Sequence, residues 1–156
     1  MNKLVSALLV SVLLVVVLSW GCSKDSGCKP VSPESEKAQI EQFMAANGLD
    51  SFKISNNIYY KILNPGAGPV PNLNSIVEVT YIGLFMNGNI FDQSPAAISF
   101  PLNQVIEGWQ LGIPLIKKGG HITLIIPSSY AYGCVGNGSI PPNSVLYFDI
   151  NLIDVK

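Results

Sequence analysis

The sequence IVEVTYIGLF at residues 76–85 decides the fold class, because its side chains alternate between two faces. Glu78 and Thr80 lie on one face of an extended chain, and apolar or aromatic residues lie on the other. That second face carries Val77, Val79 and Tyr81. This alternation is typical of a strand with one buried and one solvated face. Asn87-Gly88 favours a tight hairpin, so residues 89–91 are expected to return as a second strand.

Three further segments alternate in the same way. They are residues 58–63, 121–126 and 146–152. Asn64-Pro65-Gly66 ends the first of them, because proline lacks an amide donor and glycine favours turns. Short alternating segments separated by turn residues indicate a half-buried antiparallel sheet.

Only one short segment in this half of the chain is expected to be helical. Residues 107–113 contain Trp109, with Leu111 and Ile113 before Pro114. The predicted fold class is therefore α+β, a curled antiparallel sheet wrapped around one short helix. A second short helix is predicted upstream, over residues 35–50. Apolar residues recur there at helical spacing, Asn47-Gly48 is typical of a helix end, and so short a helix is expected to pack on its own domain.

The first 21 residues are typical of a secretory signal of lipoprotein type. Lys3 supplies a positive charge, and residues 4–18 are apolar apart from two serines. Gly21-Cys22 matches the junction at which bacterial lipoproteins are cut, so Cys22 is the predicted lipidation site. An uncleaved membrane helix is the alternative, but the 17 residues from Leu4 to Trp20 span only about 25 Å, which is marginal for a bilayer core. Either way, the globular part is expected to be exported and to stay at a membrane, facing the periplasm or the cell surface.

The remaining chain is predicted to form one domain on a tether. Residues 22–34 are rich in Ser, Gly, Lys and Pro and are expected to be a flexible spacer. The folded domain is predicted at residues 55–156, a length that suits a single core. The formal net charge is −1. Because nucleic acid requires a basic face, no nucleic-acid partner is predicted.

Cysteine and histidine offer little conventional chemistry. If Cys22 is acylated, Cys28 and Cys134 remain, and they could pair, but no spacing motif supports this. Free thiols or an intermolecular bridge are favoured instead. His121 follows Lys117-Lys118-Gly119-Gly120 at a strand start and is expected to be exposed rather than catalytic. No metal-ligand spacing or phosphate loop occurs, so no metal site and no cofactor are predicted.

Six short motifs follow one another along the second half of the chain. They are Val79-Thr80-Tyr81-Ile82-Gly83, Phe91-Asp92-Gln93-Ser94, Val105-Ile106-Glu107-Gly108-Trp109, Ala131-Tyr132-Gly133, Ile140-Pro141-Pro142-Asn143 and Leu146-Tyr147-Phe148-Asp149. In this order and spacing they resemble the FKBP-type peptidyl-prolyl isomerases over the full length of one domain. Each motif alone is a weak signal, whereas six in register are specific. The upstream helix is similar to that of exported bacterial members.

The resemblance implies a proline-binding pocket with Trp109 as its floor. The matching positions are Tyr81, Phe91, Val105, Ile106, Trp109, Tyr132, Ile140 and Phe148, with Asp92 beside them. Ile98 also counts among the substrate-binding positions, although it stands where the family usually has an aromatic residue. In the family the tyrosine matched by Tyr132 donates to a substrate carbonyl, and the amide matched by Ile106 N–H binds another. Asp92 would orient Tyr132 or polarise the site.

The implied function is cis/trans isomerisation of prolyl bonds during the folding of exported proteins. Its partners would be proline-containing unfolded chains or peptides, and macrolide inhibitors bind the same pocket in relatives. Rotation about such a bond needs no nucleophile, so an aromatic pocket suits it. Two other functions stay open, a noncatalytic chaperone and a ligand-binding surface lipoprotein. In an arbitrary α+β domain the same aromatic residues would be core residues, and only their joint match favours a site.

Overall fold

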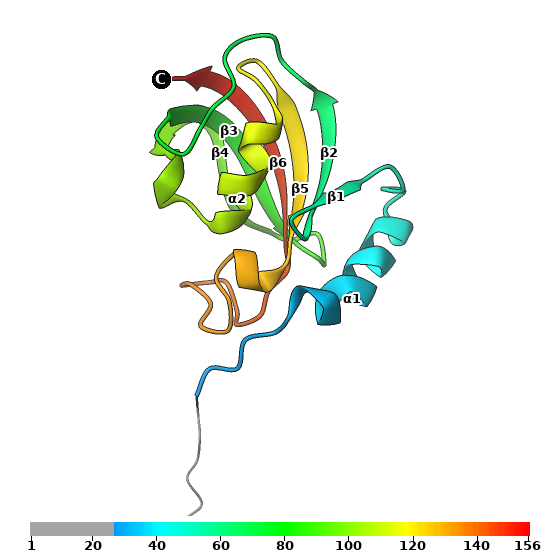
Figure 1. Cartoon of the computed structure of the whole chain (residues 1–156). Helices are drawn as coiled ribbons and strands as arrows, with labels where there is room; N and C mark the ends of the chain where they lie inside the picture. The colour runs from blue at the N-terminus through cyan, green and yellow to red at the C-terminus, as the bar shows by residue number, and fades with distance from the viewer. Residues whose placement is uncertain (1–26) are drawn as a thin grey trace, which may run out of the picture.

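The computed structural model describes residues 27–156 (Figure 1). The predicted signal at 1–21 and the predicted lipidation site Cys22 lie outside these residues. Within the described part of the chain, no helix is both long and apolar enough to cross a membrane.

Six antiparallel strands form one sheet in the order β1-β2-β5-β6-β3-β4. The strands are β1 (Lys53–Ser55), β2 (Ile58–Asn64), β3 (Ile76–Phe85), β4 (Ile90–Pro101), β5 (His121–Ile126) and β6 (Leu146–Val155). The helices are α1 (Pro33–Ala46) and α2 (Glu107–Gly112), and the 3₁₀ turns are η1 (Leu102–Gln104), η2 (Ile113–Leu115) and η3 (Ser128–Tyr130). The predicted α+β class and its two helices are confirmed.

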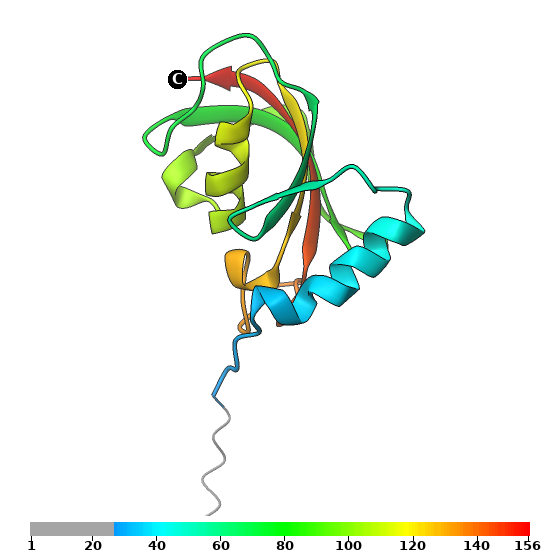
Figure 2. The same cartoon turned by 45° about the vertical axis from the view of Figure 1, so that its right-hand side comes forward.

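The sheet curls around α2, which lies against its concave face (Figures 1 and 2). Two glycines one helical turn apart allow the close approach. A Cβ at Gly112 would lie 2.6 Å from Leu124 Cδ1, and a Cβ at Gly108 would overlap Ile126. Both neighbours are fully buried residues of β5. The main hydrophobic core therefore fills the narrow space between α2 and the sheet.

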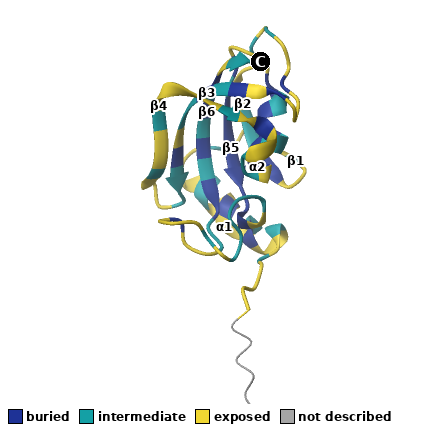
Figure 3. Ribbon diagram, turned by 90° about the vertical axis from the view of Figure 1, so that its left-hand side faces the viewer, coloured by how far each residue is buried: buried dark blue, intermediate teal, exposed yellow. Residues whose placement is uncertain are grey.

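The convex face of the sheet carries a second, smaller core beneath α1. Ile40 of α1 is fully buried there together with Tyr59, Ile125 and Val145. The prediction that this helix packs on its own domain is therefore confirmed. Figure 3 shows that the buried positions gather on the central strands, whereas the edge strand β4 is largely exposed.

Local sequence explains where α1 begins and ends. The Ser32 side chain accepts a hydrogen bond from Ser35 N at 3.4 Å, and Pro33 occupies the first turn, where its missing N–H costs nothing. Asn47 caps the other end, and Gly48 follows with φ of +65°. The helix thus starts two residues before the predicted position, at the expense of the predicted tether.

Of the two hairpins, β3–β4 was predicted from the sequence and β1–β2 was not. In the predicted β3–β4 hairpin, Gly88 adopts φ of +84° and donates to Phe85 O at 2.9 Å. The β1–β2 hairpin was not predicted. It turns through Asn56 and Asn57, both at positive φ, a conformation that asparagine tolerates better than most residues.

A disulfide joins Cys28 to Cys134, so the expectation of free thiols or an intermolecular bridge is wrong. The two Cα atoms are 5.4 Å apart although 106 positions separate them in the sequence. The cause is the docking of α1, whose N-terminal end lies beside the segment that follows β5 (Figure 1). The predicted tether at 22–34 is therefore fixed to the domain at Cys28.

Candidate functional site

A cavity of about 350 Å³ lies between the concave face of the sheet and α2. Its lining residues are Tyr81, Phe91, Asp92, Phe100, Gln104, Val105, Ile106, Trp109, Tyr132, Asn137 and Phe148. Eight of the ten predicted pocket residues are among them. The structure thus brings together side chains from three strands, α2, and the connections around η1 and η3.

Trp109 forms the floor of the cavity. The residue is 4% exposed, and its ring meets three aromatic rings edge to face, those of Tyr81, Phe148 and Phe100, with centroids 5.1, 5.3 and 6.0 Å away. These near-perpendicular contacts are the geometry that aromatic quadrupoles favour. The buried indole N–H has no acceptor among residues 27–156. The floor is therefore rigid, apolar and equipped with one unused donor.

Gly83 allows the strand wall of the cavity to close. It lies opposite Phe148 in the β3–β6 ladder, and a Cβ there would be 2.6 Å from the Phe91 ring and 3.1 Å from the Phe148 ring. Phe91 and Phe148 also contact each other edge to face at 5.5 Å. Since these rings cover the glycine backbone, their positions follow from the strand register.

The acidic group of the site binds Tyr81 rather than Tyr132. The Tyr81 hydroxyl donates to Asp92 Oδ2 at 2.6 Å across the β3–β4 pair. Burial, followed by this hydrogen bond and the charge of Asp92, raises the pKa of Tyr81 above its ordinary value. The prediction that Asp92 orients Tyr132 is therefore wrong, because Asp92 and Tyr81 lie on adjacent strands, only two residues out of register. Its alternative, that Asp92 polarises the site, stays a prediction.

The opposite rim comes from the connection between β5 and β6. Tyr132 lines the cavity half-buried, and its hydroxyl has no hydrogen-bond partner within residues 27–156. Asn137 follows on a small turn that it closes with two backbone hydrogen bonds to Ile140, at 3.0 and 2.8 Å. Gly136 is required in this turn, because it has φ of +73° and a Cβ there would overlap the Ile140 carbonyl oxygen.

Two predicted substrate-binding residues do not line the cavity. Ile140 is 7% exposed and belongs to the hydrophobic core. Ile98 lies opposite Val79 on the edge strand and is 40% exposed. Its β-branched side chain is shorter than an aromatic ring and does not line the cavity. Phe100, two residues further along the strand, lines it instead.

Sequence reasoning missed Phe100, Gln104 and Asn137. Phe100 could have been found, since it shares the two-residue period of Ile98 and is the next large side chain on that face. Gln104 and Asn137 stand in turns and carry no periodic signal. Their side chains add amide groups to a lining that is otherwise mostly aromatic.

His121 is not part of the cavity. Its Nε2 atom lies 2.7 Å from Asp149 Oδ1 on the convex face of the sheet, and both side chains are about one-third exposed. His121 is thus half-buried instead of fully exposed, because the β5–β6 pairing places the carboxylate beside it. The cavity lining contains neither residue of this pair, and it contains no serine, threonine, cysteine or lysine.

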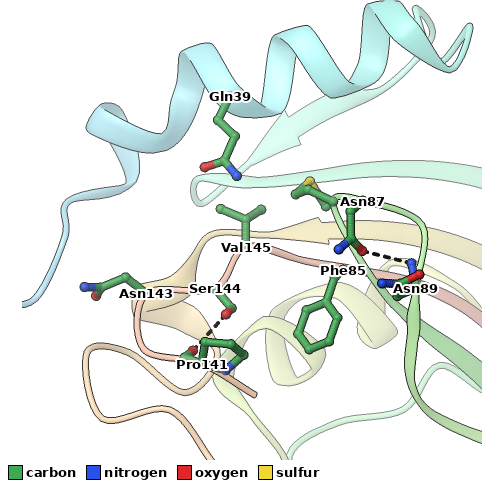
Figure 4. Close-up of a pocket in the computed structure, with 9 residues that line it drawn as sticks. Gln39, Phe85, Asn87, Asn89, Pro141, Asn143, Ser144 and Val145 are labelled. Carbon is green, nitrogen blue, oxygen red and sulfur yellow. Dashed lines mark hydrogen bonds between the residues drawn. The ribbon is translucent and has the colours of Figure 1, made fainter. Parts of the chain in front are cut away.

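A second cavity of about 440 Å³ lies between α1, the β3–β4 hairpin and residues 141–145 (Figure 4). Two of its polar side chains bond within their own segments, whereas the buried Asn143 Oδ1 has no hydrogen-bond partner among the described residues. Asn87 Oδ1 accepts from Asn89 N at 3.0 Å, and Ser144 Oγ donates to Pro141 O at 2.8 Å. The lining contains no ionisable side chain, and Phe85 is its one aromatic residue. The aromatic cavity is therefore the better candidate for a functional site.

Comparison with known proteins agrees with this placement. Residues 68–153 match the family described as FKBP-type peptidyl-prolyl cis-trans isomerase. The chain is 41% identical over 123 residues to the FKBP-type isomerase FkpA of Escherichia coli, covering 77% of this chain and 45% of FkpA. A probable FKBP-type isomerase of Haemophilus influenzae is 36% identical over 152 residues, covering 95% of this chain and 62% of that protein. This chain thus spans about half the length of the curated relatives it matches.

Solved structures extend the similarity to three dimensions. A peptidyl-prolyl cis-trans isomerase from Pseudomonas syringae superposes with a TM-score of 0.69 at 37% identity, covering 82% of this chain and 98% of that chain. FkpA of Escherichia coli superposes with a TM-score of 0.66. With the family match, the aromatic cavity and the sheet closed over α2, these similarities show that the chain belongs to the FKBP-type peptidyl-prolyl cis-trans isomerases.

Proposed function

We propose that this chain catalyses cis/trans isomerisation of prolyl bonds in the aromatic cavity. The observation that carries the proposal is the set of rings packed edge to face around Trp109, because it forms an apolar pocket of a size that a proline ring can enter. The family membership supports the same activity.

The chemistry of the reaction agrees with a pocket that has no nucleophile. Rotation about the prolyl bond breaks amide resonance and has a barrier of about 18–20 kcal/mol. The twisted amide is less dipolar than the planar amide, so an apolar environment destabilises the planar ground state relative to the transition state. Catalysis then consists of differential binding and of holding the flanking peptide in place.

Two donors are available to hold the peptide. The Tyr132 hydroxyl and the Ile106 N–H both lie at the cavity and have no acceptor among residues 27–156. In the proposed complex each donates to a substrate carbonyl, while Trp109 contacts the proline ring. Asp92 keeps the Tyr81 hydroxyl engaged, so Tyr81 contributes its ring and Asp92 contributes negative charge at the rim.

The proposed substrates are proline-containing peptides and unfolded chains, and macrolide inhibitors are proposed ligands of the same pocket. Ile98 is exposed instead of lining the pocket. The area offered to a macrolide is therefore smaller than an aromatic residue at this position would provide.

We further propose that the domain, at about residues 55–156, works outside the cytoplasm on a lipid anchor at Cys22. Residues 1–21 are typical of a signal, and the Cys28–Cys134 disulfide agrees with an oxidising compartment. Metabolic labelling with radioactive palmitate tests the anchor. Label should enter the chain but not its Cys22→Ser variant, and equal labelling of the two would rule the anchor out.

The isomerase is tested by the cis-to-trans rate of a short Leu-Pro peptide with the full chain in detergent. Trp109→Leu and Tyr132→Phe should each reduce a clear acceleration. A folded chain that accelerates nothing would refute catalysis and leave a noncatalytic chaperone. The ability of the same samples to suppress the aggregation of an unfolded protein separates the two functions. A noncatalytic chaperone would keep this ability in both variants.

A further inference from the structure

The segment that carries Tyr132 is held at both ends by one N-terminal stretch. We define the rim loop as residues 128–134, which run from the start of η3 to Cys134. Its Tyr132 lines the cavity. Both points of attachment lie on residues 28–36, more than 90 positions earlier in the sequence.

Glu36 holds the first end of the rim loop. Its carboxylate is buried, with the residue 5% exposed, and Oε2 accepts a hydrogen bond from Ser128 N at 2.9 Å. Ser128 is the first residue of η3 and is itself fully buried. A carboxylate bonded to the free amide at the start of a helical turn makes a charge-assisted hydrogen bond, which is stronger than a neutral one.

The disulfide holds the second end. Cys28 lies four positions before the α1 cap, and its partner Cys134 lies two residues after Tyr132. A covalent bond at this point limits how far the chain next to Tyr132 can move. The same short stretch therefore fixes the loop on both sides of its functional tyrosine.

Between these two points the rim loop is folded on itself. Ala131 N and Gly133 N both donate to Ser128 O, at 3.0 and 2.8 Å. A hydrogen bond from Asn57 Nδ2 to the Tyr130 hydroxyl, at 3.0 Å, adds a contact from the β1–β2 hairpin. Because Ser128 O receives both internal hydrogen bonds, a displacement of Ser128 is transmitted to the residues on either side of Tyr132.

We propose that residues 28–36 are a positioning clamp for Tyr132, with Glu36 as a positioning residue that never touches the substrate. The proposal rests on the proposed isomerase function of the cavity. The clamp keeps the Tyr132 hydroxyl where it can meet a substrate carbonyl. Without it the loop would sample many positions, and part of the orientation gained from the fixed hydroxyl would be lost.

The experiment compares variants of the full chain in detergent by kinetics and by hydrogen exchange. Glu36→Ala leaves Ser128 N–H buried without an acceptor, so kcat/KM should fall by about tenfold. Glu36→Gln keeps an acceptor oxygen and should retain most of the activity. Glu34→Ala is the matched control, because Glu34 lies on the same turn with its side chain 84% exposed and should change neither readout.

The second attachment is tested with the Cys28→Ser/Cys134→Ser double variant and with wild type treated with dithiothreitol. Both should lose activity to a similar extent, and dithiothreitol should not change the double variant further. In each weakened form, amide exchange should accelerate by on the order of tenfold in peptides that cover residues 128–137, and not in those that cover β3 or β6.

A double-mutant cycle separates positioning from a general structural role. If Glu36 acts through Tyr132, Glu36→Ala should reduce kcat/KM only slightly once Tyr132→Phe has removed the hydroxyl. A general loss of folding would instead reduce kcat/KM by the same factor in both backgrounds. An equally large loss of kcat/KM from Glu36→Ala in the Tyr132→Phe background overturns the proposal. So does a Glu36→Ala variant whose amide exchange and kinetics equal those of an active wild type.

The exchange readout also keeps the clamp distinct from the proposed function. If wild type accelerates nothing, the isomerase proposal fails, and the role of the clamp in positioning Tyr132 for catalysis fails with it, even if exchange shows that the attachment exists. If wild type is active and the clamp variants match it in kcat/KM and in amide exchange, the clamp proposal fails and the isomerase proposal stands. Should Glu36→Ala unfold, the cysteine variant and Glu36→Gln still give the decisive comparison.

Discussion

The two sides of the cavity are positioned in different ways. On the sheet side, Tyr81 and Phe148 stand on β3 and β6, which pair along nine positions, and their rings pack on Trp109. On the rim side, Tyr132 and Asn137 stand on a connection fixed by a few hydrogen bonds and one disulfide. The apolar wall is therefore part of the hydrophobic core, whereas we expect the exposed polar side chains of the rim to contribute less to stability.

Replacing Trp109 by alanine should have the largest effect, because the ring belongs both to the core and to the site. Loss of a buried tryptophan should lower the free energy of unfolding by about 3–5 kcal/mol. Urea unfolding measures this directly, with Trp109→Phe as the control that keeps part of the ring contacts. A loss below about 1 kcal/mol would show that the sheet side is not part of the core.

Gly83→Ala tests whether the wall depends on the bare backbone under its two phenylalanines. The added methyl group would lie 2.6 Å from Phe91, so a ring must move. We expect a loss of about 1–3 kcal/mol, measured by urea unfolding, and a weakened affinity for proline peptides. Gly88→Ala is no suitable control, because Gly88 has positive φ. Ala97→Gly on the exposed edge strand is preferable, and an equal loss there would contradict the expectation.

Tyr81→Phe removes the hydrogen bond to Asp92 and should cost about 1 kcal/mol near neutral pH. Because folding raises the pKa of Tyr81, the protonated tyrosine contributes stability that is fully present below its ordinary pKa of 10.0 and is lost as the pH rises above it. The stability difference between wild type and Tyr81→Phe should therefore be constant from about pH 7 to pH 9 and shrink above about pH 10. Urea unfolding across this range measures it, and a difference that grows with pH would contradict the assigned hydrogen bond.

Asn137→Ala should have the smallest effect on folding. Its backbone closes the turn with Ile140, while its exposed side chain only lines the rim, so the free energy of unfolding should change by less than about 0.5 kcal/mol. The change should appear instead in the relative kcat/KM for peptides that differ in the residue next to proline. If Asn137→Ala left the substrate preference unchanged but lowered the free energy of unfolding strongly, the expected difference between rim and wall would be wrong.

The alternation of apolar and polar residues predicted the strands that have a neighbouring strand on each side. β2, β3, β5 and β6 each have one face against a core, so their apolar residues recur with period two. Most of β4 was missed because Ser94-Pro95 is typical of a turn. Proline is tolerated there because β4 is an edge strand that pairs with β3 alone.

The candidate site was predicted where a side chain belongs to a motif, and was missed where tertiary docking decides. Trp109, Tyr132 and the strand aromatics were found together in the cavity. The partner of Asp92 depends on the register of two strands, and the partner of Cys28 depends on where α1 docks. Neither is encoded within one segment, so local sequence could not supply them.

The central place of β6 determines when the fold can be completed. This strand lies between β5 and β3, so it joins the β1-β2-β5 half of the sheet to the β3-β4 half, yet it is the last strand in the sequence. A chain that emerges N-terminus first, from a ribosome or through a membrane, must therefore hold two half-sheets with unpaired edges until residues 146–155 arrive. Such edges are sites of aggregation, and pairings this distant in sequence form slowly. The edges of the two half-sheets are therefore covered only when the last strand of the chain has emerged.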